Sequence, residues 1–189
     1  VVWQVYDSYL QTNAGYYTMQ NACEPLHVQL NLINNKVTVV NRKYKPAPNL
    51  TTVVEVFDID SKSIFREEAY FSLGASEVKE STSLANILDK ARGVSFIKLN
   101  LRDAAGKVVS TNIYWLSKDG DYKALNKLPE ASITASLVRT EKGKAETRRT
   151  FIFTNNSTKI AFFVRPQLML RENEILPSFW SGNYITLAP

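Results

Sequence analysis

The sequence predicts a mainly β protein with two β-sandwich domains in tandem, preceded by a short helical segment. After Pro25, short runs alternate apolar and polar residues, as half-buried strands do. Turn residues such as the Asn34-Asn35 pair separate these runs at the spacing of an antiparallel sandwich. A polar stretch that ends in Pro129 separates two groups of strands. We therefore divide the chain into helix, sandwich, linker and sandwich at residues 1–25, 26–117, 118–129 and 130–189.

The opening residues predict two short helical turns. Their apolar residues recur at helical spacing, first at Trp3, Tyr6 and Leu10 and then at Ala14, Tyr17 and Ala22. Thr12 or Asn13 can cap the second turn, and Pro25 cannot continue it. The rest of the chain is β in pattern. This helix therefore either lies on a sheet or is the edge of a helical layer outside the chain, and we favour the second.

Residues 26–117 contain about seven predicted strands, the number in an immunoglobulin-like sandwich. The strands are expected at residues 26–31, 37–42, 52–59, 64–73, 78–84, 96–101 and 108–116. Residues 45–49 contain two prolines and are expected to form a loop, and residues 83–90 are expected to carry a helical turn.

Residues 130–189 contain about five predicted strands, fewer than a complete immunoglobulin-like sandwich needs. They are expected at residues 133–139, 148–154, 160–170, 179–180 and 184–187. Pro166 predicts a bulge or a sheet edge within the third of them. Lys142-Gly143-Lys144 predicts a solvated hairpin tip between the first two.

Three segments, in the same order, resemble the end of the catalytic barrel and the following immunoglobulin-like domains of glycoside hydrolase family 2. They are residues 3–27, which end in Ala-Cys-Glu-Pro-Leu-His, residues 113–117 and residues 176–184. The branch that they resemble contains exo-β-glucosaminidases and mannosylglycoprotein endo-β-mannosidases. The resemblance implies that the helical segment ends an upstream barrel, which would be the partner of these domains. It also implies a further strand after residue 189, and therefore an unpaired edge.

The resemblance places the two catalytic glutamates of the family upstream, so we assign no catalytic residue here. The local acidic pairs are Glu67 with Glu68, Asp58 with Asp60, and Glu172 with Glu174. Neighbouring residues of a strand point to opposite faces, and the other two pairs border turns where solvated acids are common. Asp119-Gly120-Asp121 lacks the remaining ligands of a calcium loop and predicts an Asx turn.

The single cysteine excludes an intrachain disulfide. One cysteine and one histidine supply too few of the usual ligands for a zinc site. We expect Cys23 to be a packing residue and His27 to lie at the start of a strand. Neither a metal nor a cofactor is expected.

Three aromatic residues are candidates for contacts with carbohydrate or for interface packing. They are Trp115, Trp180 and Tyr184. A flat aromatic ring complements the C–H face of a pyranose, whereas a tryptophan inside a strand usually packs in a core. Acceptor sequences for N-glycosylation occur at Asn49, Asn155 and Asn156, and they matter only if the source glycosylates.

The leading hypothesis is a non-catalytic accessory region of a family 2 glycosidase that acts on β-mannosides or β-glucosaminides. The alternatives are a carbohydrate-binding module that uses exposed aromatics and a structural immunoglobulin-like array. The net charge of +5 comes without a nucleic-acid-binding motif, and no apolar run is long enough to span a membrane. The chain begins with Val, so we expect it to start inside a longer gene product. The sequence leaves its compartment open, with a periplasmic or secreted parent favoured.

Overall fold

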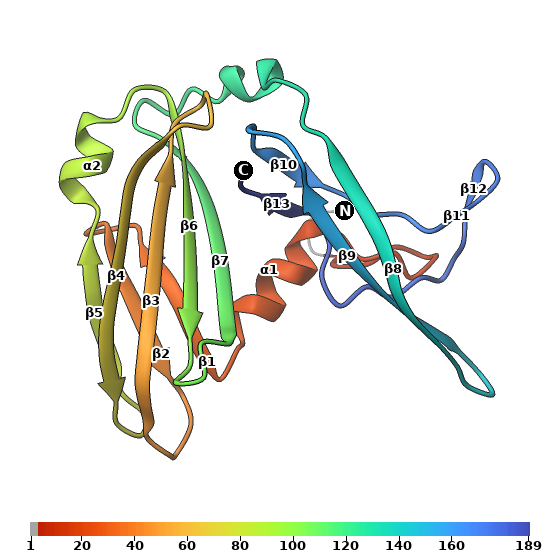
Figure 1. The fold of residues 1–189 in the computed structure, drawn as a ribbon, viewed down its shortest axis with the longest axis horizontal. Helices are drawn as coiled ribbons and strands as arrows, with labels where there is room; N and C mark the ends of the chain where they lie inside the picture. The colour runs from red at the N-terminus through yellow and green to blue at the C-terminus, as the bar shows by residue number, and fades with distance from the viewer. Residues whose placement is uncertain (1–3) are drawn as a thin grey trace.

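A computed structural model describes residues 4–189, so the predicted role of Trp3 lies outside the described residues. It contains a first domain of seven strands and a second domain of six strands. The helix α1 (Ala14–Ala22) lies between them (Figure 1). The prediction of a mainly β chain with two immunoglobulin-like domains behind a short helix is confirmed.

The segment before α1 is not helical, so the first predicted helical turn is wrong. Tyr6 and Thr12 instead form an isolated antiparallel bridge around a tight loop. The carboxylate of Asp7 accepts the backbone N–H groups of Tyr9 and Gln11, and these short-range bonds favour a turn over a helix. The second helical turn is confirmed as α1. Its N-cap is Asn13, whose side chain accepts the N–H of Tyr16.

The first domain consists of two antiparallel sheets. One sheet has the order β1-β2-β5 and contains β1 (Leu26–Asn31), β2 (Lys36–Asn41) and β5 (Val78–Ser83). The other has the order β4-β3-β6-β7 and contains β3 (Ala47–Phe57), β4 (Ser63–Leu73), β6 (Val94–Arg102) and β7 (Val108–Ser117). The helical turn expected after β5 is present as α2 (Ala85–Lys90).

The predicted loop at residues 45–49 is wrong in its second half, because β3 already begins at Ala47. Ala47 pairs with Leu73, and the ladder then skips two residues before Leu50. The irregularity contains Asn49, which has a φ of 52° and donates its N–H to Ser72 Oγ. A bulge therefore lets the strand continue where the prolines suggested a loop.

The apolar residues of both sheets meet in one continuous core. Its fully buried members come from five strands and include Val28, Val39, Val54, Ile97, Leu99 and Leu101. Alternation along β1 and β6 places these side chains on the inner faces, as a sandwich requires.

The second domain begins after the 3-10 helix η1 (Lys123–Lys127). Its strands are β8 (Ile133–Lys142), β9 (Thr147–Asn155), β10 (Ala161–Val164), β11 (Met169–Leu170), β12 (Asn173–Glu174) and β13 (Ile185–Leu187). Among the described residues they pair only in twos, as β8-β9, β10-β13 and β11-β12. The hairpin predicted around Gly143 is the β8-β9 connection.

Two strand predictions in the second domain need correction. The strand predicted at residues 160–170 is divided into β10 and β11, with Pro166 in the gap, because proline cannot donate to a ladder. Residues 179–180 are not a strand. Trp180 instead packs against the rings of Phe151 and Phe153, with ring centroids 6.1 and 6.3 Å away.

An apolar cluster joins the two domains. Phe57 and Phe96 of the first domain pack with Ile160 of the second, and Trp115 and Phe162 are among the residues packed against them. The N–H of Ile160 donates to Ser61 Oγ at 2.9 Å, and both residues are buried. The junction therefore combines apolar packing with a hydrogen bond that solvent does not reach.

Candidate functional site

A groove of about 1210 Å³ lies between the two domains. Its walls are α1, the edge strand β7 and the last residues of the second domain, so segments far apart in the sequence meet there (Figure 1). Trp115 and Tyr184, two of the three aromatics singled out from the sequence, line this groove. Trp180 does not line it and lies on the β8-β9 sheet.

The aromatics of the groove pack against one another at steep angles. Trp115 contacts Phe162 and Phe163 with ring centroids 5.1 and 5.6 Å apart and interplanar angles of 79° and 75°. Phe163 in turn lies 5.3 Å from Tyr184. Such pairs contribute packing energy between domains and do not present a flat platform to a sugar. A carbohydrate contact by Trp115, Trp180 or Tyr184 stays a prediction.

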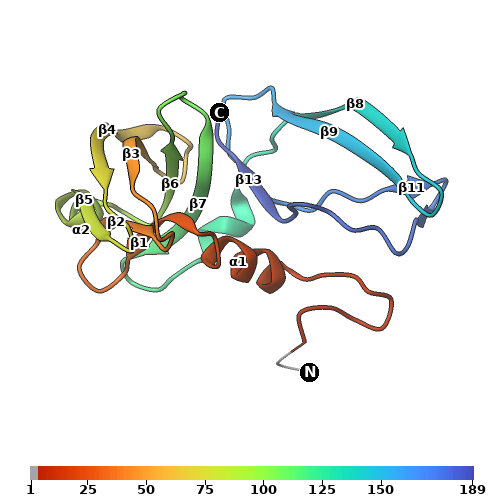
Figure 2. The same ribbon diagram turned by 90° about the horizontal axis from the view of Figure 1, so that it is seen from below.

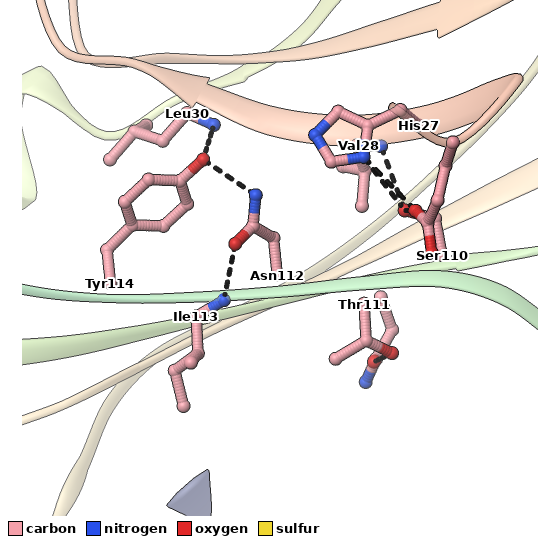
Figure 3. Close-up of polar contacts among 10 residues, drawn as sticks. His27, Val28, Leu30, Ser110, Thr111, Asn112, Ile113 and Tyr114 are labelled. Carbon is pink, nitrogen blue, oxygen red and sulfur yellow. Dashed lines mark hydrogen bonds and ion pairs between the residues drawn. The ribbon is translucent and has the colours of Figure 1, made fainter. Parts of the chain in front are cut away.

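The open edge of the first sandwich, between β1 and β7, is closed by side chains. The N–H of Val28 donates to Ser110 Oγ at 3.2 Å, and the N–H of Leu30 donates to the Tyr114 hydroxyl at 3.0 Å (Figure 3). Strand β7 thus satisfies two edge donors of β1 without any backbone ladder between the sheets. Buried backbone donors are costly to leave unpaired, so these two side chains stabilise the edge.

Asn112 satisfies a backbone donor of β7 itself. Its Oδ1 accepts the N–H of Ile113 at 3.0 Å, and its Nδ2 donates to the Tyr114 hydroxyl at 2.9 Å (Figure 3). Burial raises the pKa of Tyr114, although its hydrogen bonds with Leu30 and Asn112 oppose the shift. An edge whose donors are already satisfied is a poor template for another strand.

A second polar cluster ties the end of α1 to the same edge. The hydroxyl of Ser110 donates to Glu24 Oε2 at 2.5 Å, and Nδ1 of the buried His27 lies 3.1 Å from the same oxygen. Serine, histidine and a carboxylate suggest a nucleophile relay, but a relay uses the two ring nitrogens for different partners. Here Nδ1 faces both Ser110 and Glu24, so the cluster is a structural clamp.

His27 lies in β1, next to the strand start expected for it, but its partners were not foreseen. No sequence signal relates it to Ser110, which is 83 residues away. The prediction that Cys23 packs is wrong, because Cys23 follows α1 as its C-cap and is exposed.

The N-terminal segment also contacts the second domain. Gln11 Nε2 donates to Glu174 Oε2 at 3.0 Å, and Arg165 Nη2 donates to the same oxygen at 3.1 Å. In α1, Tyr17 is buried and its ring lies 6.3 Å from Tyr184. The segment therefore runs along the second domain before it enters the first (Figure 2).

Glu67 and Glu68, the acidic pair within a strand, bind different partners. Glu67 accepts from Thr82, whereas Glu68 on the opposite face accepts from Arg66. Within residues 4–189, no buried side-chain nitrogen or oxygen lacks a hydrogen-bond partner, and no cluster of metal-ligating residues is present. The N–H of Asp121 donates to Asp119 Oδ1 at 3.1 Å, which is the predicted Asx turn.

The two halves of the chain match two domain families. Residues 34–118 match the family described as the mannosidase Ig/CBM-like domain, and residues 112–189 match the exo-β-D-glucosaminidase Ig-fold domain. The chain belongs to the immunoglobulin-like region of glycoside hydrolase family 2. Among the described residues, no helix of this immunoglobulin-like region is long and apolar enough to cross a membrane.

Relatives match three quarters or nearly all of this family 2 immunoglobulin-like region. The exo-β-D-glucosaminidase of Arthroderma benhamiae is 28% identical over 99% of the chain and 23% of its own length. The mannosylglycoprotein endo-β-mannosidase of Lilium longiflorum is 32% identical over 74% of the chain and 15% of its own length. The crystal structure of the Amycolatopsis orientalis exo-chitosanase CsxA matches 99% of the chain and 25% of its own, with a TM-score of 0.87 and 25% identity. The chain thus spans about a quarter of these glucosaminidases.

Proposed function

We propose that the chain is a non-catalytic accessory region of a family 2 glycosidase that acts on β-glucosaminides or β-mannosides. Its two domains would buttress the catalytic barrel of the same polypeptide. The observation that carries this proposal is the alignment with exo-β-D-glucosaminidases, which covers 99% of the chain but 23% of the relative. The polar groups gathered along β7 support it, because they close an edge and clamp α1 and do not form a reaction centre.

Exposed apolar side chains in the second domain support a large partner surface. They lie on the β8-β9 sheet and after it, at Leu137, Val138, Ile152, Leu170 and Phe179. These hairpins extend away from the first domain (Figure 1). A soluble domain rarely leaves so many large apolar side chains in water unless another surface covers them. We propose that the barrel covers these side chains. We also propose that residues 118–129 are the linker between two domains with different roles.

The first test is hydrolysis by the isolated chain. Aryl β-glucosaminide and aryl β-mannoside should be cleaved no faster than in buffer, because the resemblance to family 2 places the two catalytic glutamates upstream of this chain. Hydrolysis above background that is lost in a Glu67→Gln, Glu68→Gln or Glu174→Gln variant would contradict the proposal.

The second test uses the whole gene product that contains the chain. Leu170→Lys should bury a charge in the proposed interface with the barrel. The temperature at which half of the activity is lost should therefore fall by several degrees. The matched control is Leu32→Lys, an exposed leucine of the first domain, which should leave this temperature unchanged. Equal temperatures for both variants would count against barrel contact through these hairpins. A gene with repeated sandwiches and no barrel would instead support the structural array.

A further inference from the structure

The outer face of the β4-β3-β6-β7 sheet forms a trough along the central strand β3. Thr51 of β3 pairs with Tyr70 of β4 on one side and with Arg102 of β6 on the other. Directly paired residues of antiparallel strands share a face, so Tyr70 and Arg102 form two walls above Thr51. The next residue of β3 on this face, Val53, is paired in the same way with Glu68 and Asn100.

A hollow of about 560 Å³ lies at the Tyr70 end of this trough. It is lined by residues of β3, β4 and the β6-β7 turn, including Asn49, Thr51, Glu68, Tyr70, Arg102 and Asp103. The start of β3 and the end of β6 lie at the end of the sandwich away from the linker (Figure 1). The second domain therefore does not cover the hollow, and its volume lies within the range of small-molecule sites.

Tyr70 is held in place although it is 76% exposed. Its hydroxyl donates to Glu68 Oε2 at 3.2 Å, while Arg66 Nη2 holds the other oxygen of Glu68 at 2.5 Å. These bonds fix the aromatic ring beside the hollow and lower the pKa of the Glu68 carboxyl, so it is ionised near neutral pH. A side chain that is already ordered loses less conformational entropy when a ligand binds than a side chain that rotates freely.

Arg102 supplies the donors. In the described part of the chain its guanidinium takes part in none of the ion pairs, although the residue is half-buried. Asn100, further along the trough, lines the groove between the domains and not the hollow. The trough thus combines a stacking ring, a carboxylate acceptor and several N–H donors, which is the set that a polyhydroxylated ring uses.

The charges around the hollow decide between ligand classes. Arg66 does not line the hollow but forms an ion pair with Glu68, and the lining residues Arg102 and Asp103 have opposite charges, so these four side chains sum to zero. A polyanion or a polycation would be repelled by two of these four side chains and attracted by the other two. An uncharged sugar meets no such repulsion. The geometry points to a binding site for a neutral β-linked oligosaccharide, with Tyr70 stacking on one pyranose and Arg102 and Glu68 bonding to its hydroxyls.

The site itself goes beyond the accessory role, since a buttressing domain needs no glycan contact. The choice of β-linked sugars as its ligands rests on the proposed function. The site also differs from the aromatics expected from the sequence, which lie in the groove or on the β8-β9 sheet.

The experiment is a titration of the 189-residue chain with β-linked mannotriose and with triacetylchitotriose, followed by amide NMR shifts up to about ten millimolar ligand. We expect saturable binding of at least one trimer, with shifts at residues 49–51, 68–70 and 102–103. Tyr70→Ala should weaken binding at least about tenfold, and Arg102→Met should weaken it by a smaller factor. Both side chains reach solvent, so the variants should keep the amide dispersion of the folded chain.

Tyr44→Ala is the matched control, because Tyr44 is 93% exposed but does not line the hollow. Its affinity should equal that of the parent chain. The proposal is overturned if neither neutral trimer binds, or if Tyr70→Ala binds as tightly as the parent chain. It is also overturned if Tyr184→Ala alone abolishes binding, or if the cationic glucosamine trimer binds more tightly than its acetylated form.

Discussion

The two domains share an immunoglobulin-like class but obtain their stability in different ways. In the first domain, sheets of three and four strands enclose a core whose side chains are almost completely buried. In the second domain, strands pair only in twos among the described residues, and every residue of β8 after Ile133 is exposed. One domain therefore carries its own core, whereas the buried Ile160 of the other packs with Phe57 and Phe96 of the first.

Polar contacts follow the same division. The first domain uses Ser110 and Tyr114 to close the edge between its own two sheets. The second domain uses Asn155, whose Nδ2 donates to the carbonyls of Lys159, Leu187 and Ala188. Asn155 therefore joins the end of β9 to the last residues of the chain through its side chain, because β9 and β13 form no backbone ladder.

The largest expected effect is in the core of the first domain. Leu99→Ala should lower the free energy of unfolding by about 3 to 5 kcal/mol, because Leu99 is fully buried and leaves a cavity. Leu137→Ala in β8 should change it by less than about 0.5 kcal/mol, because Leu137 is 55% exposed. Urea unfolding of the two variants measures the contrast. Similar losses would show that the second domain has a core of its own.

The next largest effect is expected at the junction between the domains. Phe162→Ala should lower the free energy of unfolding by about 2 to 3 kcal/mol, which is less than the effect of removing a fully buried aromatic ring. The two domains of this variant should then unfold separately. Phe162 packs on Phe96 and Trp115, so its loss uncouples the domains. Calorimetry should then show two transitions. Phe179→Ala, at a residue that is 74% exposed, is the control, and a single transition in both variants would contradict the expected coupling.

A moderate effect is expected for the polar connection within the second domain. Asn155→Ala should cost about 1 to 3 kcal/mol, because three carbonyls lose a shared donor. Asn173→Ala, at an exposed asparagine of β12, should change the unfolding free energy by less than about 0.5 kcal/mol. Chemical denaturation compares the two. If both cost the same, Asn155 would not be the link between β9 and the final residues.

The smallest effect should appear in the alkaline range. Tyr114→Phe should cost about 0.5 to 1.5 kcal/mol at neutral pH, because Leu30 and Asn112 lose a hydrogen-bond partner. Burial raises the pKa of Tyr114 in the folded state. Its stabilisation is therefore complete below the unfolded value of about 10 and is lost as the pH rises through the folded value.

The measurement is the free energy of unfolding at several pH values from about 8 to about 11, on both sides of the ordinary tyrosine pKa. The parent chain should lose stability faster than Tyr114→Phe across this range. Tyr44→Phe, at an exposed tyrosine, should follow the parent chain. Parallel curves for the parent and Tyr114→Phe would contradict a buried neutral phenol at the β1-β7 edge.

Local patterns were sufficient for most of the first domain. Alternation from Leu26 to Asn31 and the Asn34-Asn35 turn predicted the first hairpin, and Asn35 adopts the positive φ expected there. Local patterns failed where short-range side-chain bonds compete with the helix, as at Asp7. They also failed where a ring finds a tertiary partner, as Trp180 does on Phe151 and Phe153.

The sequence alone determined the strand content, the division into two groups of strands and the resemblance to family 2, because these depend on residues that are near neighbours in the chain. Only the tertiary structure decided which polar side chains meet. The bond from Val28 to Ser110 joins residues 82 positions apart, and the trough below Tyr70 needs three strands in register. Periodicity states which face a residue takes, but the partner across that face is chosen when the sheets pair and pack.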